Sequence, residues 1–497
     1  AVTELYTAGD ILSLTLLLTR PLAALVRKME KKRQGKARWK RFLTVGTAII
    51  VGASILLVAF ALLVRIGALS LSSFANITGA PLQADSGTTN ILLLGQGNED
   101  HDGIDLTDTI MVASIDGDGK SVVLLSLPRD LYFLHADSLT IKKGKLNALW
   151  RDERIALRRA GLERREASLK ALQGVAHEVG EALGIPVHYT VKVDFTAFEQ
   201  IIDALGGIDI AVPEAMDDME YPGPNYTFEP FHIAAGLQNL DGAAALKYAR
   251  TRHTSSDFDR SARQQQILQA LNEKAKSSGL LNKPGKLLEL YTILHVHIET
   301  DMSTREMVTL GSLGMELSRN QFISMQLSDS NGLYEGPLAP GGLLYSPPRD
   351  LFEGASMLLP VSIPEFPVTW KQVQTFSSLL FGHRELYLAH PKIAVFNGGG
   401  PEGSARRLAR EFLKFGFEIV EIANLPEKQK VPSSFLAQSN PAFPEEKTAW
   451  FLSFLRAKEG TLQHLNPQPD ISGADLVIVL GEDYDFQFFQ NLSLPNA

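Results

Sequence analysis

Cysteine is absent from all 497 residues of the chain. Its absence excludes disulfide bonds, thiolate zinc sites and cysteine nucleophiles, but it does not exclude an extracellular location. The chain also lacks His-Glu-x-x-His, Gly-x-Ser-x-Gly and a phosphate loop ending in Gly-Lys-Ser/Thr, three widespread hydrolase signatures. Basic charge is in deficit, because 48 Lys and Arg face 56 Asp and Glu, and the formal charge of −8 argues against nucleic acid as a partner.

One long hydrophobic run stands near the N-terminus. Residues 42–64 carry no charge and are mostly apolar, so the run is long enough to cross a bilayer as a single transmembrane helix. Eight Lys and Arg at positions 28–41 precede it, opposed only by Glu30, whereas Arg65 alone follows directly. The positive-inside rule therefore predicts a single-pass protein of the cytoplasmic membrane, with residues 1–41 inside and the remainder outside. A cleavable signal peptide is the alternative, but the run is too long and too far from the start.

The region after a linker at 65–87 alternates strand and helix patterns. Short, β-branched apolar runs predict strands at 90–95, 109–115, 121–127, 187–193 and 208–212. Helical periodicity predicts one long helix at 151–185 and another at 195–205. This alternation predicts an α/β domain, a sheet sandwiched by helices, extending over residues 88–330.

Charged residues stand at the ends of the predicted strands. Asp105 and Asp108 precede the second strand, and Arg129 follows the third. Because ligand sites gather at strand ends, a carboxylate and a guanidinium can meet there. The alternative is that Asp108 caps a turn and Arg129 pairs with its neighbour Asp130.

A second charged stretch covers residues 248–266. If residues 248–252 form a strand, Arg250 and Arg252 point the same way as a two-pronged clamp. The following residues predict a helix with one stripe that begins charged and ends apolar: Asp257, Arg260, Gln264, Ile267 or Leu268, and Leu271. Since the apolar half must face the core, we expect the charged half to point inward and to bind an anion. The alternative is a surface helix with a salt-bridged first turn.

The C-terminal part predicts an irregular linker at 331–389 and a small α/β domain at 390–485. Strands are predicted at 392–396, 418–422 and 476–480, with a helix at 404–415. Gly398, Gly400 and Gly403 satisfy the dinucleotide-binding spacing Gly-x-Gly-x-x-Gly. Glu402 would then lie among the phosphates, which argues against a dinucleotide.

The ordered motifs resemble the LytR-CpsA-Psr family, over about residues 88–275. The resemblance is carried by Asn-Ile-Leu-Leu-Leu-Gly at 90–95, Leu-Thr-Asp-Thr-Ile-Met at 106–111, Leu-Ser-Leu-Pro-Arg-Asp at 125–130, Lys-Leu-Asn at 145–147, Val-Asp-Phe at 193–195, Asp-Ala-Leu-Gly-Gly at 203–207 and the arginine stretch. Residues 395–398 and 477–481 are similar to the LytR C-terminal domain. Members of the family are membrane-anchored enzymes with an extracytoplasmic catalytic domain. They move a glycopolymer from a polyprenyl-pyrophosphate carrier to a cell-wall acceptor, typically a peptidoglycan hydroxyl.

The resemblance also implies roles for individual residues. Asp108 matches a carboxylate that binds Mg²⁺. The implied pyrophosphate ligands are Arg129, Arg250, Arg252 and Arg260, with Asp257 and Gln264 as further polar residues of the pocket and Arg263 and Asp259 close enough to belong to it.

The chain departs from the family pattern after the first strand. Gly97 stands where the family usually has a second metal-binding aspartate, so Asp105, Asp100 or Glu99 would have to replace it. The family's frequent arginine before Thr-Asp is Leu106 here. The expected chemistry is neutralisation of a pyrophosphate by arginines and Mg²⁺ while a hydroxyl attacks phosphorus, with Asp108 or Asp257 as the base. A non-catalytic binder of polyprenyl phosphates or wall polymer, and a polyprenyl-pyrophosphate hydrolase, are the alternatives.

Overall fold

The computed structural model describes residues 79–97, 105–118, 121–221, 227–251, 257–278, 293, 297–329, 342–362, 367–455 and 457–485. The predicted cytoplasmic segment 1–41 and membrane span 42–64 lie outside these residues. Among the residues that are described, no helix combines the length and the apolar character needed to cross a membrane.

A six-stranded mixed sheet forms the centre of the first domain, in the order β11-β6-β1-β2-β3-β12. Its strands are β1 (Thr88–Gln96), β2 (Thr107–Asp116), β3 (Val122–Ser126), β6 (Tyr189–Asp194), β11 (Ile298–Thr300) and β12 (Phe322–Gln326). β1 pairs antiparallel with β2 and parallel with β6, and β3 pairs parallel with β12. The strands predicted at 90–95, 109–115, 121–127 and 187–193 are confirmed within a few residues at their ends.

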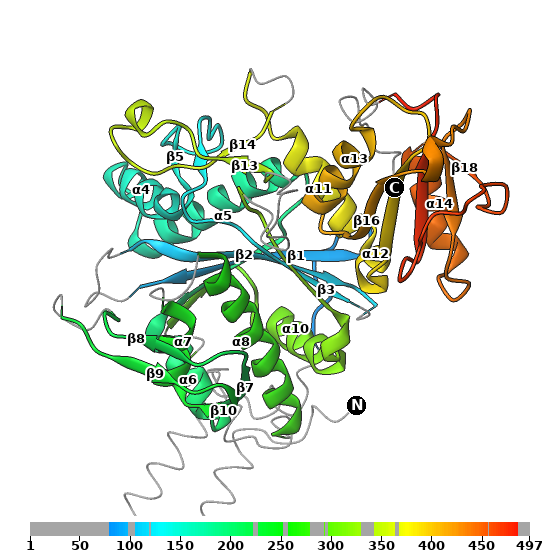
Figure 1. The fold of residues 1–497 in the computed structure, drawn as a ribbon. Coiled ribbons are helices and arrows are strands. Elements are labelled where there is room, and N and C mark those ends of the chain that lie inside the picture. Colours follow the sequence, from blue (N-terminus) through cyan, green and yellow to red (C-terminus); the bar gives the residue numbers. More distant parts are fainter. Residues whose placement is uncertain are drawn as a thin grey trace, which may run out of the picture. The chain divides into compact units, whose positions relative to one another are not determined.

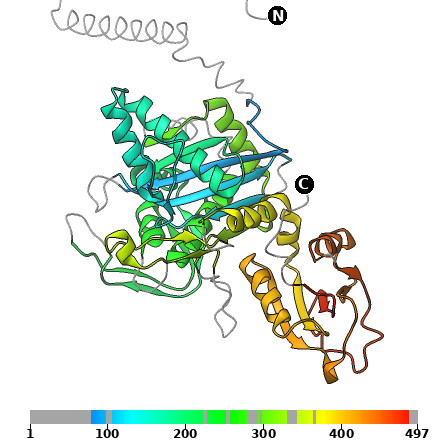
Figure 2. The same cartoon turned by 90° about the horizontal axis from the view of Figure 1, so that it is seen from above.

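The two faces of this sheet carry separate cores, because side chains alternate along each strand. Leu92, Leu94 and Val112 pack with α4 (Leu146–Arg159) and α5 (Arg164–Leu183). Their neighbours Ile91 and Met111 belong to the opposite core, which includes α10 (Thr304–Glu316) and part of α8 (Asp257–Ser277). Figure 1 shows α4 and α5 on one side of the strands and α8 and α10 on the other, and Figure 2 shows α4 and α5 in turquoise over the blue strands. The predicted helix-covered sheet is confirmed.

One long helix was the prediction for residues 151–185, and it is wrong. The structure has two helices, α4 and α5, separated by a turn at residues 160–163. Gly161 lies in this turn with φ +98°, a conformation that interrupts a helix and that glycine adopts without steric cost. α4 also begins five residues earlier than expected, because Leu146, Leu149 and Trp150 supply its buried face.

Short elements complete the side of the domain that holds α8. The predictions for 195–205 and 208–212 are confirmed by α6 (Phe195–Leu205) and β7 (Ile208–Val212), and β7 pairs with β10 (Gly236–Leu240). α7 (Gly242–Arg250) packs beside them through Tyr248, and α8 contributes Ile267 to the same core. The remaining short elements are β4 (Tyr132–Phe133), β5 (Gly144–Lys145), β8 (Met216–Asp218), β9 (Phe231–Ile233) and the 3-10 helix η3 (Arg319–Gln321).

Residues 331–389 were expected to be irregular, and the structure places regular elements there. The pair β13 (Leu344–Tyr345) and β14 (Leu359–Pro360), the 3-10 helix η4 (Arg349–Phe352), α11 (Lys371–Gly382) and α12 (Arg384–Ala389) fall in this segment. α11 buries Val373, Phe376 and Leu380, a helical spacing that the Gly- and Pro-rich stretch before it obscured. Only part of the segment is therefore a linker.

The last domain is a five-stranded sheet in the order β16-β15-β19-β17-β18. Its elements are β15 (Lys392–Asn397), α13 (Ser404–Lys414), β16 (Glu418–Asn424), η5 (Pro426–Lys428), β17 (Phe435–Gln438), α14 (Glu445–Leu455), β18 (Lys458–Glu459) and β19 (Leu476–Leu480). The predicted strands and helix of this domain are confirmed. α13 buries Leu408 and Phe412, which pack in the core shared with Ile393 of β15.

Candidate functional site

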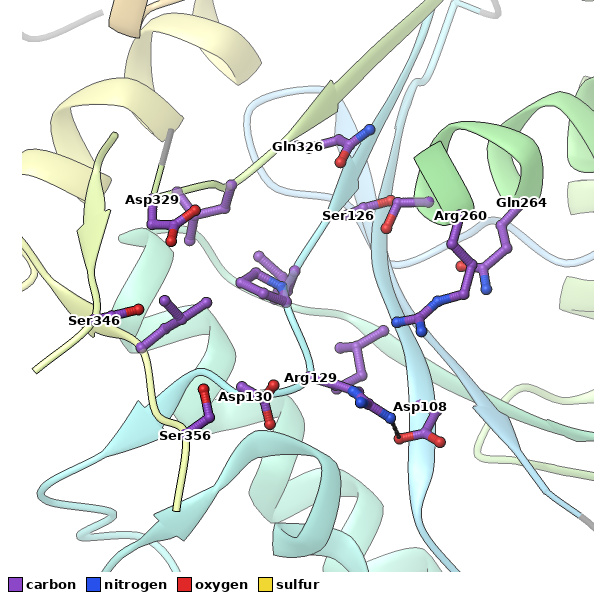
Figure 3. Close-up of a pocket in the computed structure, with 16 residues that line it drawn as sticks. Asp108, Ser126, Arg129, Asp130, Arg260, Gln264, Gln326, Asp329, Ser346 and Ser356 are labelled. Carbon is purple, nitrogen blue, oxygen red and sulfur yellow. Dashed lines mark hydrogen bonds and ion pairs between the residues drawn. The ribbon is translucent and has the colours of Figure 1, made fainter. Parts of the chain in front are cut away.

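A cavity of about 170 Å³ lies where β2 begins and where β3 and β12 end. Five predicted or motif residues line it: Asp108, Arg129, Asp130, Arg260 and Gln264. Figure 3 shows Asp108 on its strand opposite Arg129, with Arg260 and Gln264 approaching from a helix. The structure thus brings together charged residues from three segments that are far apart in the sequence.

Asp108 and Arg129 form an ion pair at one wall of the cavity. Arg129 Nη1 donates to Asp108 Oδ1 over 3.2 Å, and the side chains are 24% and 41% exposed, so a ligand can reach both. Asn147 Nδ2 of α4 donates to the same oxygen over 3.4 Å. Asp130, the alternative partner of Arg129, instead accepts from Lys145 over 2.6 Å. Lys145 and Asn147, the two polar residues of the Lys-Leu-Asn motif, thus hydrogen-bond to the carboxylates of the site.

Arg260 and Gln264 approach the cavity from α8, four residues apart and therefore on one face of the helix. The Arg260 side chain is buried, with 5% of the residue exposed, and Ile267 further along the helix is 1% exposed. For Arg260 and Gln264, the prediction that the charged half of this helix points inward is confirmed. Because Arg260 lines the cavity and a guanidinium is a good ligand for phosphate, this wall is a candidate place for an anion.

Arg250 stands at the end of a helix, so the prediction of a strand at 248–252 is wrong. Residues 242–250 form α7, whose first-turn amide at Ala244 is capped by the Asp241 carboxylate over 2.8 Å. Arg250 Nη1 donates to the Tyr221 hydroxyl over 3.0 Å, and its guanidinium lies 4.5 Å from the centroid of the Phe195 ring. Burial raises the pKa of Tyr221, and the Arg250 charge opposes that rise, so Tyr221 is a neutral donor or acceptor at ordinary pH. Arg250 is not among the residues that line the cavity.

Three further predicted residues have different surroundings. Arg252 lies outside the described residues, and of Asp257 only the backbone position, at the start of α8, is described. Asp259 is exposed. Of the predicted clamp, the structure therefore describes Arg250 and not Arg252, so the clamp stays a prediction.

Arg263 is buried beneath the arginine stretch. Its Nε donates to the Tyr248 carbonyl over 2.9 Å and its Nη2 donates to the Thr251 carbonyl, and burial lowers its pKa. Carbonyls at a helix end have no partner within the helix. Arg263 thus binds the C-terminal end of α7, which carries Arg250, and it does not line the cavity.

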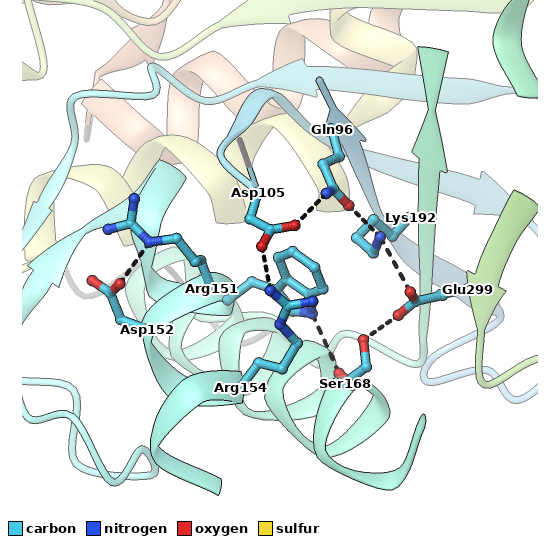
Figure 4. Close-up of polar contacts among 9 residues, drawn as sticks. Gln96, Asp105, Arg151, Asp152, Arg154, Ser168, Lys192 and Glu299 are labelled. Atoms are coloured by element: carbon cyan, nitrogen blue, oxygen red, sulfur yellow. Dashed lines mark hydrogen bonds and ion pairs between the residues drawn. The ribbon is translucent and has the colours of Figure 1, made fainter. Parts of the chain in front are cut away.

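Asp105 belongs to a separate polar network, drawn in Figure 4. One of its oxygens accepts from Gln96 Nε2 over 2.8 Å, and the other pairs with Arg154. Lys192, whose pKa is lowered by burial, contacts Gln96 and lies 4.4 Å from the centroid of the Trp150 ring. Within the described part of the chain, no three His, Asp or Glu side chains gather as a metal site.

Sequence reasoning missed one wall of the cavity. Asp329, Ser346, Ser356 and Leu358 line it opposite the arginines. Ser346, Ser356 and Leu358 fall in the segment that was expected to be a linker, Asp329 lies near the end of the predicted catalytic domain, and no motif marked any of them.

The family model of the LytR-CpsA-Psr family matches residues 70–337. The chain belongs to the LytR-CpsA-Psr family. A second model, described as LytR cell envelope-related transcriptional attenuator, matches residues 390–484, the span that contains the dinucleotide-like glycines.

The proteins to which this chain is similar include the following two. "Cell wall biosynthesis protein LcpA" of Corynebacterium glutamicum is 27% identical over 79% of this chain and 72% of its own length. "Polyisoprenyl-teichoic acid–peptidoglycan teichoic acid transferase TagV" of Bacillus subtilis is 28% identical over 46% of this chain and 54% of its own length. The crystal structure of B. subtilis TagV covers 60% of this chain and 99% of its own, at 22% identity with a TM-score of 0.41.

Proposed function

We propose that this LytR-CpsA-Psr protein transfers a glycopolymer from a polyprenyl-pyrophosphate carrier to a hydroxyl of peptidoglycan or another envelope acceptor. The observation that carries the proposal is that Arg129 and Arg260 line the same cavity, beside the carboxylate of Asp108. The names of the similar proteins, LcpA for cell wall biosynthesis and TagV for transfer of teichoic acid to peptidoglycan, point the same way.

The chemistry requires charge neutralisation more than covalent work by the protein. An acceptor hydroxyl attacks the phosphorus next to the sugar, the bond to the bridging oxygen breaks, and polyprenyl phosphate leaves with the electron pair. Arg129 and Arg260 offer planar sets of donors that match phosphate oxygens, and charge on these oxygens is where an electrostatic catalyst acts. The hydroxyl proton passes to a carboxylate, Asp108 or Asp257.

Magnesium fits the residues present. Mg²⁺ is usually held by one or two carboxylates together with substrate phosphates, and Asp108 supplies a carboxylate at the cavity wall. Asp105 does not add a second ligand in this arrangement, because Gln96 and Arg154 occupy its two oxygens. When bound, the ion would withdraw charge from the pyrophosphate.

We further propose the location that the charge pattern predicts. A span at 42–64 would anchor the protein in the cytoplasmic membrane, with the N-terminus inside and the catalytic domain outside. The lipid-linked donor and the wall acceptor are both accessible there, and nucleic acid is not a partner.

One experiment separates transfer from the two alternatives. The full chain is incubated with Mg²⁺, a polyprenyl-pyrophosphoryl sugar and peptidoglycan, in parallel with its Asp108→Ala variant. Attachment of the sugar to peptidoglycan by the parent protein, but not by the Asp108→Ala variant, supports transfer. Release of sugar phosphate without attachment identifies a hydrolase, and donor binding without turnover identifies a carrier-binding protein; either result contradicts the proposal.

A further inference from the structure

Part of the cavity wall comes from a segment beyond the family match. The family model ends at residue 337, whereas Ser346, Ser356 and Leu358 line the same cavity as Asp108 and Arg260. The LytR C-terminal match begins only at residue 390. Residues 342–358 therefore contribute to the site although they lie outside both matched regions.

Backbone hydrogen bonds fix this segment to the catalytic domain at both ends. Gly342 N donates to Asp329 O over 2.8 Å, and Leu344 N donates to Ser328 O over 3.1 Å, just after β12. At the other end, Leu358 N donates to Asp130 O over 2.9 Å, and Leu358 O accepts from Tyr132 N over 2.9 Å. The second attachment is to the residue directly after Arg129, so the segment is held in register with the proposed phosphate ligands.

The two ends of the cavity differ in chemistry. Arg129, Arg260 and Gln264 occupy one end, and Asp329, Ser346 and Ser356 occupy the other, as Figure 3 shows. Ser346 and Ser356 are exposed and Asp329 is half-buried. Among the residues that the structure describes, no cation pairs with Asp329, whereas Asp130 pairs with Lys145.

Hydroxyls and carboxylates accept hydrogen bonds from sugar hydroxyls, while a carboxylate repels a phosphate. The apolar side chains of Leu127, Pro128 and Leu358 line the cavity as well, and they suit the C–H face of a sugar ring. This end therefore favours an uncharged, hydroxyl-bearing ligand. An acceptor that attacks phosphorus must also approach from the side away from the leaving oxygen.

We propose that Asp329, Ser346 and Ser356 form a subsite for an uncharged sugar ring of the acceptor, and that residues 342–358 determine which acceptor is used. The inference rests on the proposed transfer function. Asp329 and the two serines hold the sugar so that its hydroxyl faces the phosphate bound by Arg129 and Arg260.

The test compares the Ser346→Ala/Ser356→Ala double variant and Asp329→Asn with a matched control, Asp350→Asn. Asp350 is exposed, belongs to η4 of the same segment and does not line the cavity. Transfer by the full chain is measured as a function of peptidoglycan concentration and, separately, of donor concentration. Each lost hydrogen bond weakens binding a few-fold, so we expect the apparent KM for the acceptor to rise about tenfold in the double variant. The donor KM and the behaviour of Asp350→Asn should stay within about twofold of the parent.

The possible results distinguish a sugar of the acceptor from a sugar of the donor, and they distinguish failure of the subsite from failure of the proposed transfer function. A rise in the donor KM alone would assign the subsite to the donor's sugar and overturn the acceptor assignment, and unchanged KM values would overturn the subsite itself. If the parent protein shows no transfer, the proposed function fails. Binding of a soluble peptidoglycan disaccharide fragment, measured by calorimetry on the same proteins, then decides the subsite: weaker binding by the variants supports it, and equal binding or none overturns it.

Discussion

Replacement of Arg260 perturbs the proposed anion site most directly. The residue is 5% exposed and lines the cavity from α8, so its guanidinium is already largely desolvated at the cavity wall. A pre-organised donor aimed at developing charge contributes about 10²- to 10³-fold to a rate, and we expect Arg260→Met to lower kcat by at least about 100-fold. Arg260→Lys keeps the charge but loses the planar fork, so its loss should be intermediate, about tenfold or more.

The assay is transfer of a labelled sugar from a polyprenyl-pyrophosphoryl donor to peptidoglycan, with thermal unfolding measured in parallel. Arg159→Met is the control, because Arg159 is an exposed arginine at the end of α4 that does not line the cavity. Arg159→Met should retain parental activity. A folded Arg260→Met protein with kcat within threefold of the parent would refute the assignment of Arg260 to the phosphate.

Three further changes have defined outcomes. A Cβ added at Gly97 would lie 3.6 Å from the nearest atom of the Phe195 ring, which is an ordinary contact, so the Gly97→Asp variant should fold normally. It should also lower the Mg²⁺ concentration that gives half-maximal transfer. An unchanged or higher Mg²⁺ concentration would contradict the idea that Gly97 stands where the family has a metal-binding aspartate. Arg263→Met removes two buried hydrogen bonds to the end of α7 and should lower the free energy of unfolding by about 2–4 kcal/mol in denaturant titration, and a loss below about 0.5 kcal/mol would count against its structural role. His188 Nδ1 accepts a hydrogen bond from Asn90 N over 2.9 Å, and burial lowers the pKa of His188, so folding favours the neutral ring. The contribution of His188 to stability is therefore complete above the unfolded-state pKa of about 6.5, and it is lost as the pH falls through the lower folded-state pKa. His188→Gln should flatten this part of the curve of unfolding temperature against pH, and an identical curve would contradict the assignment.

The fold of the catalytic domain was largely predictable because its strands are short, β-branched and buried on both faces. α6 and β7 have the predicted bounds, since Asp194 caps the helix and Gly206 ends it with φ +82°. The inward direction of Arg260 was also predictable, because it shares a helical stripe with Ile267. These features depend on residues that are close together in the sequence, so the sequence pattern predicts them.

What escaped prediction depends on tertiary contacts. Arg263 looks like a ligand in the sequence, yet it is an anchor for helix carbonyls, and only the three-dimensional position of Tyr248 reveals this. Asp105 looks like a metal ligand, yet Arg154 from α4 pairs with it across 49 residues of sequence. Ser346 and Ser356 reach the cavity only because backbone hydrogen bonds attach their segment next to Asp130. Sequence patterns carry no signal for such long-range attachments.

We propose that this chain joins a lipid-linked glycopolymer to an acceptor through phosphorus chemistry in the cavity of Asp108, Arg129 and Arg260. The most direct measurement is mass spectrometry of both products after a single turnover of the full chain with Mg²⁺, donor and peptidoglycan. We expect one phosphodiester-linked sugar on the acceptor for each polyprenyl monophosphate released, and neither product with Asp108→Ala. Attachment without phosphorus in the linkage, or release of polyprenyl phosphate with no attachment, would contradict it.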